Sequence, residues 1–178
     1  MAGPSSAARN RECEPSHAVG PDGRYVRRVF KLLLFLHLLA AIFAVGPLVG
    51  AATTASRALR SADAAAATSA ARMIRLYSYV SVVVVILGMG LMSQKAPWDS
   101  SEKVADMGDT WIWLSLLLWV AAMAVSLGVL APSLTKAAAE IGGSGSASAL
   151  VGRVAAAGGV IGLIYAGIVV LMVYQPGG

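Results

Sequence analysis

The stretch WIWLSLLLWVAAMAVSLGVLA, from Trp111 to Ala131, decides the fold class of this chain. It contains no Asp, Glu, Lys, Arg or His. A helix of this length, rising about 1.5 Å per residue, crosses a hydrocarbon layer roughly 30 Å thick. The stretch therefore predicts a transmembrane helix.

Three further stretches of about 20 residues share this character. They run from Val29 to Gly50, from Met73 to Met92 and from Val154 to Val173. The last has no charged side chain, and the first two carry a basic residue only near their starts. Because the connections between the stretches are short, helices that follow one another should run antiparallel. We predict an all-α polytopic membrane protein with four transmembrane helices in an up-down antiparallel bundle.

Composition agrees with this prediction. Hydrophobic residues make up 57% of the 178 residues, charged residues 13%, and the mean hydropathy is +0.72. Such a chain has too little polar surface for a water-soluble domain. The net charge of +5 comes from basic residues spread over the N-terminal part and the connections, without a dense stripe. This pattern favours the lipid bilayer with its anionic headgroups as partner, and no nucleic acid.

The N-terminal segment, residues 1–28, mixes Pro, Gly and Ser with charges of both signs. It has no periodic apolar face, so we predict a disordered tail followed by a transmembrane domain over residues 29–178. A signal peptide is the alternative, but the apolar run after the tail is longer than the usual apolar region of about 7 to 15 residues. We expect an uncleaved first span. Cys13 is the single cysteine and cannot form an internal disulfide.

The distribution of basic residues predicts the orientation. With the N-terminus inside, eight basic residues lie on the cytoplasmic side and six on the outer side. Because a tail that carries six of them is costly to translocate, both termini should be cytoplasmic. We expect a multi-pass protein of the bacterial cytoplasmic membrane.

Two backbone features are predicted near the first span. Pro47 removes a backbone donor and crowds the carbonyl of Phe43, which predicts a kink between them. The following segment is rich in Ala and free of Pro and Gly, so the first two helices should continue past the membrane to a turn near Ser61 to Asp63.

His37 is the one histidine within a span, and ionisable groups inside membranes often have functional roles. Two interpretations stay open. A neutral imidazole can hydrogen-bond to a neighbouring helix and need no cofactor. Alternatively, His37 can ligate haem b or copper together with Met89 or Met92, whose thioethers suit Cu(I).

Small residues predict close helix contacts. Without a hydrophobic driving force between helices in lipid, side chains such as Gly and Ala at four-residue spacing allow backbones to approach. Beside His37, a groove lined by small residues could receive a partner helix, from a second copy of the chain or another membrane protein, or a flat ligand. The predicted packing residues are Ala41, Ala44, Gly158, Gly162 and Ala166.

Motifs for catalysis are missing from the sequence. It has no nucleophile-histidine-acid set, no paired carboxylates in the spans, no HExxH and no phosphate-binding Gly loop with Lys. The serines of spans two and three, Ser78, Ser81, Ser115 and Ser126, should bond to the backbone of their own helices. The sequence favours a non-enzymatic accessory or binding protein, with haem or copper handling through His37 as the alternative.

Three segments carry a family resemblance. KLLLFLHLLAAIFAVGP in the first span, WIWLSLLLWVAAMAVSLGVLAPSL in the third and the ending VVLMVYQPG resemble small bacterial integral membrane proteins, frequent in actinobacteria, with a domain of unknown function. The resemblance covers most of residues 29–178, although Gln175 stands where the family often has Lys. His37 also resembles the first-span histidine of copper-resistance D proteins and of four-helix haem-dependent protoporphyrinogen oxidases. Those enzymes have further polar residues in other spans that this chain lacks, so their activity is not implied.

Overall fold

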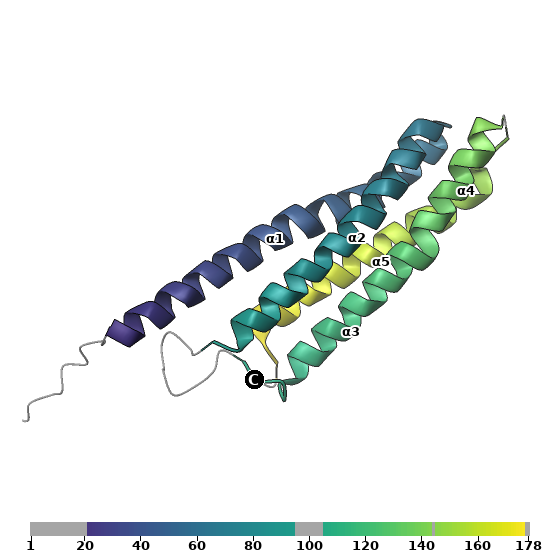
Figure 1. Ribbon diagram of the computed structural model, residues 1–178. Coiled ribbons are helices and arrows are strands. Elements are labelled where there is room, and N and C mark those ends of the chain that lie inside the picture. Colours follow the sequence, from purple (N-terminus) through teal and green to yellow (C-terminus); the bar gives the residue numbers. More distant parts are fainter. Residues whose placement is uncertain (1–20, 95–104, 144, 177–178) are drawn as a thin grey trace, which may run out of the picture.

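The computed structural model describes residues 21–94, 105–143 and 145–176, with side chains from Tyr25 onward. Described elements are α1 (Pro21–Arg60), α2 (Ala64–Met92), α3 (Thr110–Val125), the π-helical turn η1 (Ser126–Leu130), α4 (Ala131–Gly142) and α5 (Ser148–Tyr174) (Figure 1). α1 begins at Pro21, before the predicted start of the first span. The rest of the predicted tail and the connection 95–104 lie outside the described residues.

Four helical rods are long and apolar enough to cross a membrane, and they confirm the predicted fold class. They span Tyr25–Arg60, Ala64–Met92, Thr110–Gly142 and Ser148–Tyr174. The third rod consists of α3, η1 and α4 in direct succession. Each rod extends beyond the apolar stretch predicted from the sequence. For the first two helices, this extension was predicted from the Ala-rich segment between them.

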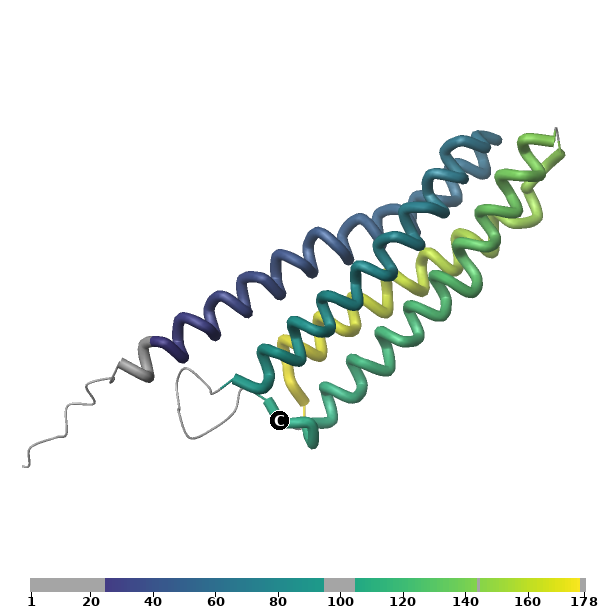
Figure 2. Tube along the Cα trace, in the orientation of Figure 1, coloured from purple at the N-terminus to yellow at the C-terminus, as the bar shows by residue number. Residues whose placement is uncertain are grey.

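The rods alternate in direction along the chain (Figure 2). α1 packs on α2 and α5, α2 packs on α4, and α3 packs on α5. This is the predicted up-down antiparallel bundle. As a result, the start of α1 and the end of α5 lie at one end of the bundle, and the turn after α1 lies at the other (Figure 1).

The turn between α1 and α2 falls at the predicted residues, Ser61 to Asp63. The N–H of Asp63 donates to the carbonyl of Ala58, and the N–H of Ala62 donates to that of Leu59. These two bonds form a Schellman motif, which requires a left-handed residue at Ala62, whose φ is 49°. The Asp63 side chain then caps α2 by accepting from the N–H of Ala66 at 2.8 Å.

Two prolines, Pro47 and Pro132, lie within the helical rods, and the helix geometry next to them differs. α1 continues as one helix through Pro47. Pro132 follows the π-helical turn η1, in which the N–H of Ala131 donates to the carbonyl of Ser126, five residues earlier. Because Pro132 has no N–H and its ring crowds the carbonyl of Gly128, a widened turn at this point accommodates it.

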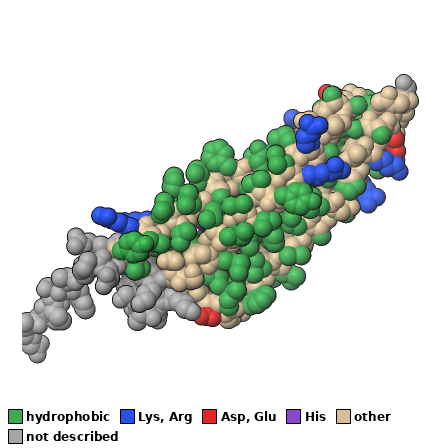
Figure 3. Space-filling view, in the orientation of Figure 1, with side chains coloured by type: hydrophobic (Ala, Val, Ile, Leu, Met, Phe, Trp, Pro, Cys, Tyr) green, Lys and Arg blue, Asp and Glu red, His purple; other side chains and the backbone are tan. Residues whose placement is uncertain are grey.

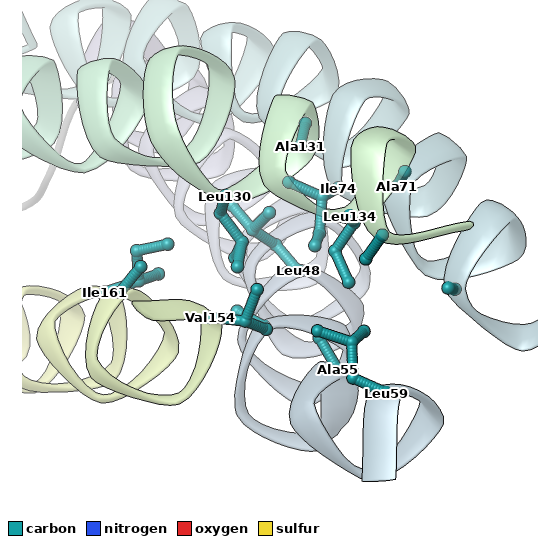
Figure 4. Close-up of a cluster of buried hydrophobic side chains, with 14 of the residues drawn as sticks. Leu48, Ala55, Leu59, Ala71, Ile74, Leu130, Ala131, Leu134, Val154 and Ile161 are labelled. Carbon is teal, nitrogen blue, oxygen red and sulfur yellow. The ribbon is translucent and has the colours of Figure 1, made fainter. Parts of the chain in front are cut away.

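The buried hydrophobic side chains form one core cluster, which reaches Leu59 and Ala67 on either side of the α1–α2 turn, and Figure 4 shows a part of it. Side chains from all four rods converge there. The larger members with no exposed surface are Leu48, Ile74, Leu130, Leu134, Val154 and Ile161. Small alanines fill the spaces between them and allow the helices to approach closely.

The outer surface is apolar along the middle of the bundle, and basic side chains gather at the end that carries the α1–α2 turn (Figure 3). Large apolar side chains such as Phe35, Ile42 and Leu163 are more than half exposed. In a membrane, these side chains face lipid rather than water. The exposed basic residues of this end are Arg57, Arg60, Arg72, Arg75, Lys136 and Arg153.

Candidate functional site

His37 lies on the face of α1 that contacts the bundle. Between Tyr25 and Pro47, the buried residues of α1 are Phe30, His37 and Ala44, which follow one another at a spacing of seven residues. A seven-residue repeat keeps side chains on one seam between two packed helices. His37 is only 9% exposed, whereas its neighbours Leu36 and Leu38 face outward.

The imidazole of His37 is hydrogen-bonded to the backbone of α2. Its Nδ1 lies 3.0 Å from the carbonyl oxygen of Val84. A carbonyl oxygen can only accept, so in this bond Nδ1 must carry the hydrogen. A neutral imidazole then keeps its lone pair on Nε2. The contact joins α1 to α2 within the apolar part of both helices.

Gly88 makes room for this imidazole. A Cβ placed on Gly88 would lie 3.1 Å from Cε1 and 3.5 Å from Nδ1 of His37. The ring therefore packs directly on the backbone of α2, one turn beyond the carbonyl that it binds. Neither Val84 nor Gly88 was predicted from the sequence to contact His37. The glycine was the available signal, because Gly in a membrane helix often marks a close contact.

The two methionines proposed as ligands lie on the same part of α2. Met89 directly follows Gly88 and is 44% exposed, and Met92 is half-buried. The structure places Gly88 against the imidazole. Among the described residues, no group of three or more His, Cys, Asp and Glu side chains is arranged to hold a metal ion. The second histidine, His17, lies outside the described part of the chain.

The predicted packing residues occupy different environments. Gly158 lies directly on α1, because a Cβ there would overlap the carbonyl oxygen of Ala52 and lie 2.8 Å from its carbonyl carbon. At Gly162, the nearest atom to a Cβ would be Cγ2 of Thr53 at 3.8 Å, an ordinary contact. The α1–α5 crossing is therefore tightest at Gly158.

The other three predicted packing residues differ in how far they are buried. Ala44 is buried between helices, and Ala41 is half-buried beside it. Ala166 is exposed on the outer side of α5. Gly159, the direct neighbour of Gly158, also faces outward, with nothing within 4 Å of an added Cβ. Within one copy of the chain, close helix contact thus involves Gly158 and Ala44 but not Ala166.

Comparison with known protein families identifies the family of this chain. The family described as predicted integral membrane protein (DUF2269) matches residues 31–176. The chain belongs to this family. The DUF2269 match includes His37, Val84, Gly88 and Gly158, and it extends over all four spanning helices. Comparisons with curated proteins and with solved structures gave no match. The predicted resemblance to a family of integral membrane proteins of unknown function is confirmed, and the likeness to copper-resistance D proteins stays a prediction.

Proposed function

We propose that this protein is a non-enzymatic accessory or binding protein of the bacterial cytoplasmic membrane, with both termini in the cytoplasm. The observation that carries this proposal is the hydrogen bond from His37 to the Val84 carbonyl. This bond gives His37, the one histidine in the described spans, a structural role, because it attaches the first half of α1 to α2. No cofactor is needed for that role.

The apolar surface supports the same proposal. The exposed side chains of α1 between Leu32 and Phe43 are large and apolar. Association within a membrane depends on packing and on interhelical hydrogen bonds. An apolar outer surface of this kind suits contacts with lipid and with other transmembrane helices, either from a second copy or from another membrane protein.

A second candidate function is haem or copper handling through His37 with Met89 or Met92. It has one favourable observation. Metal-binding histidines commonly donate their other ring N–H to a carbonyl or carboxylate, which fixes the tautomer and leaves one nitrogen for the metal. The Val84 carbonyl does this for Nδ1 of His37, so Nε2 is the nitrogen that would bind. Soft thioethers on the same turn of α2 would complete the ligand set.

One set of measurements separates the two functions. The full-length protein, purified in mild detergent from its own membranes, is analysed by absorbance spectroscopy and by elemental analysis. His37→Gln and His37→Leu are purified in the same way. We expect no Soret band and no stoichiometric copper in any of the three proteins. A Soret band or copper in the wild-type protein that both substitutions remove would establish the second function and overturn the first.

Thermal unfolding of the same samples tests the structural role of His37. Gln keeps a donor that can reach the Val84 carbonyl, so His37→Gln should unfold close to the wild-type temperature. His37→Leu loses an interhelical bond worth on average about 0.6 kcal/mol in membranes and should unfold earlier. Equal stability of the Leu and Gln variants would contradict a role of His37 in joining α1 to α2.

A further inference from the structure

Four buried hydroxyl groups inside the bundle have no hydrogen-bond partner among the described residues. They belong to Ser78 on α2, Ser115 on α3, Ser126 at the start of η1 and Tyr165 on α5. Ser78 and Ser126 have no exposed surface, and Ser115 and Tyr165 are each 7% exposed. The serines were predicted to bond to the backbone of their own helices. Ser81 does so, but these three serines do not.

Ser81 connects α2 to α3 at this level of the bundle. Its hydroxyl donates to the carbonyl of Ser78 at 2.7 Å and accepts from Nε1 of Trp119 on α3 at 3.0 Å. The sulfur of Met123 on α3 lies 3.7 Å from the same oxygen. Tyr165 on α5 lies near the same level, because a Cβ on Gly167, two residues further along α5, would lie 3.8 Å from the side chain of Leu118, the residue before Trp119 on α3. α2, α3 and α5 thus bring polar side chains to one level within the apolar part of the bundle.

The antiparallel register brings Ser78 level with Ser126. Ser81 lies against Trp119 and Met123, so a step of one turn backward along α2 corresponds to a step of one turn forward along α3. One turn back from Ser81 is Ser78, and one turn forward from Met123 is Ser126. Both side chains are fully buried, so their unpartnered hydroxyls point into the bundle at this level. We call Ser78, Ser81, Ser126 and Tyr165 the hydroxyl layer.

A dry hydroxyl layer would be costly in a membrane. Buried polar groups in globular proteins are nearly always hydrogen-bonded, and the bilayer interior offers no solvent to replace a missing partner. The π-helical turn η1 begins at Ser126, and turns of this kind widen a helix and occur often at functional sites. The widened turn and the unpartnered hydroxyls lie at the same point of the third rod.

The chemistry of the hydroxyl layer defines its ligand. Hydroxyl groups both donate and accept, and the described layer contains no carboxylate to attract a cation and no basic group to attract an anion. The ligand must therefore be small, uncharged, and able to donate and accept. Buried water molecules have this chemistry and typically bond to about three otherwise unsatisfied polar groups.

We propose that the hydroxyl layer is an internal water-binding site, in which ordered water bridges Ser78 on α2, Ser126 at η1 and Tyr165 on α5. The bridge joins three rods inside the hydrophobic core, of which Tyr165 is a member. This site uses none of the residues around His37, so it is independent of the proposed function.

The first test compares the thermal stability of Ser78→Ala and Ser126→Ala with that of the full-length wild-type protein in detergent. If water bridges the hydroxyls, each substitution removes a bond and lowers the apparent Tm by about 2–4 °C. Ser69→Ala on the exposed side of α2 is the matched control and should leave it unchanged. If the hydroxyls are dry, the two buried substitutions remove an unsatisfied group, and an unchanged or raised Tm would overturn the proposal.

The second test detects the water in the wild-type protein itself. X-ray radiolysis converts bound water into hydroxyl radicals that modify adjacent side chains, and mass spectrometry measures the modification. We expect the buried Tyr165 and the half-buried Met123 to be modified, and the modification to fall at least severalfold in the Ser78→Ala/Ser126→Ala double variant. Modification of both residues that is equal in wild type and double variant would overturn the proposal.

Discussion

His37 on α1 and Gly88 on α2 form a matched pair, because the imidazole occupies the space that a side chain at Gly88 would need. The ring reaches the carbonyl oxygen of Val84 at 3.0 Å, and a Cβ on Gly88 would lie 3.1 Å from its Cε1. The glycine thus allows a polar side chain to reach the backbone of the neighbouring helix inside the membrane. The pair explains how His37 is buried among apolar residues without a charged partner.

This pair predicts that substitutions at the two positions are not additive. Gly88→Ala should crowd the imidazole and lower the stability of the protein. In a His37→Ala background, Gly88→Ala should not lower the stability, because the imidazole that the new methyl group would crowd is absent. We expect a coupling free energy within the range of about 0.5–3 kcal/mol seen for residues in contact. Unfolding of the four proteins in detergent measures it.

Gly90 provides the matched control for this cycle. It lies on the same helix, and nothing lies within 4 Å of an added Cβ. Gly90→Ala should leave stability unchanged or raise it slightly, since Ala is the better helix former. If the effects of Gly88→Ala and His37→Ala on the free energy of unfolding were additive, this would show that the imidazole does not pack on Gly88.

Gly158 should be the most sensitive glycine of α5. A Cβ at this position would overlap the backbone of Ala52, which cannot rotate away as a side chain can. Gly158→Ala should therefore separate α1 from α5 and cost at least about 1–3 kcal/mol, the usual cost of overpacking. Gly159→Ala adds the same methyl group to the outer face and should be tolerated. Similar unfolding temperatures for the two variants would show that α5 does not cross α1 at Gly158.

Ala62 should be stabilised by replacement with Gly. Its φ of 49° lies in the left-handed region, which costs an L-residue with a Cβ about 1–2 kcal/mol. Ala62→Gly should recover about 1 kcal/mol in thermal or denaturant unfolding. Ala139→Gly, at an exposed position within α4, is the control. It should lower the stability, since Gly weakens a right-handed helix. A loss of stability from Ala62→Gly would mean that the turn does not form the Schellman motif.

The orientation in the membrane can be tested with reporter fusions. Gln94 and the end of α5 lie at one end of the bundle, and Ser61 and Gly143 lie at the other (Figure 1). If the basic N-terminal segment stays inside, fusions after Gln94 and Gly178 should report the cytoplasm, and fusions at Ser61 and Gly143 should report the outside. The reverse pattern would place the cluster of six exposed basic residues in the cytoplasm.

The sequence by itself determined the four spans, their alternating direction and the turn at Ser61 to Asp63. Hydrophobicity over about 20 residues is a local property, and short connections leave antiparallel packing as the simple arrangement. The family match over residues 31–176 agrees with this part of the prediction.

Only the tertiary structure decided which small and polar residues meet. Gly158 and Gly159 are equivalent in sequence, yet one lies on Ala52 and the other faces outward. Likewise, Val84 accepts the hydrogen bond of His37 although it lies 47 residues further along the chain, and Ser81 accepts from Trp119 across a separation of 38 residues. The rotation of each helix about its axis determines these contacts, and that rotation depends on the summed packing of all four rods rather than on any local pattern.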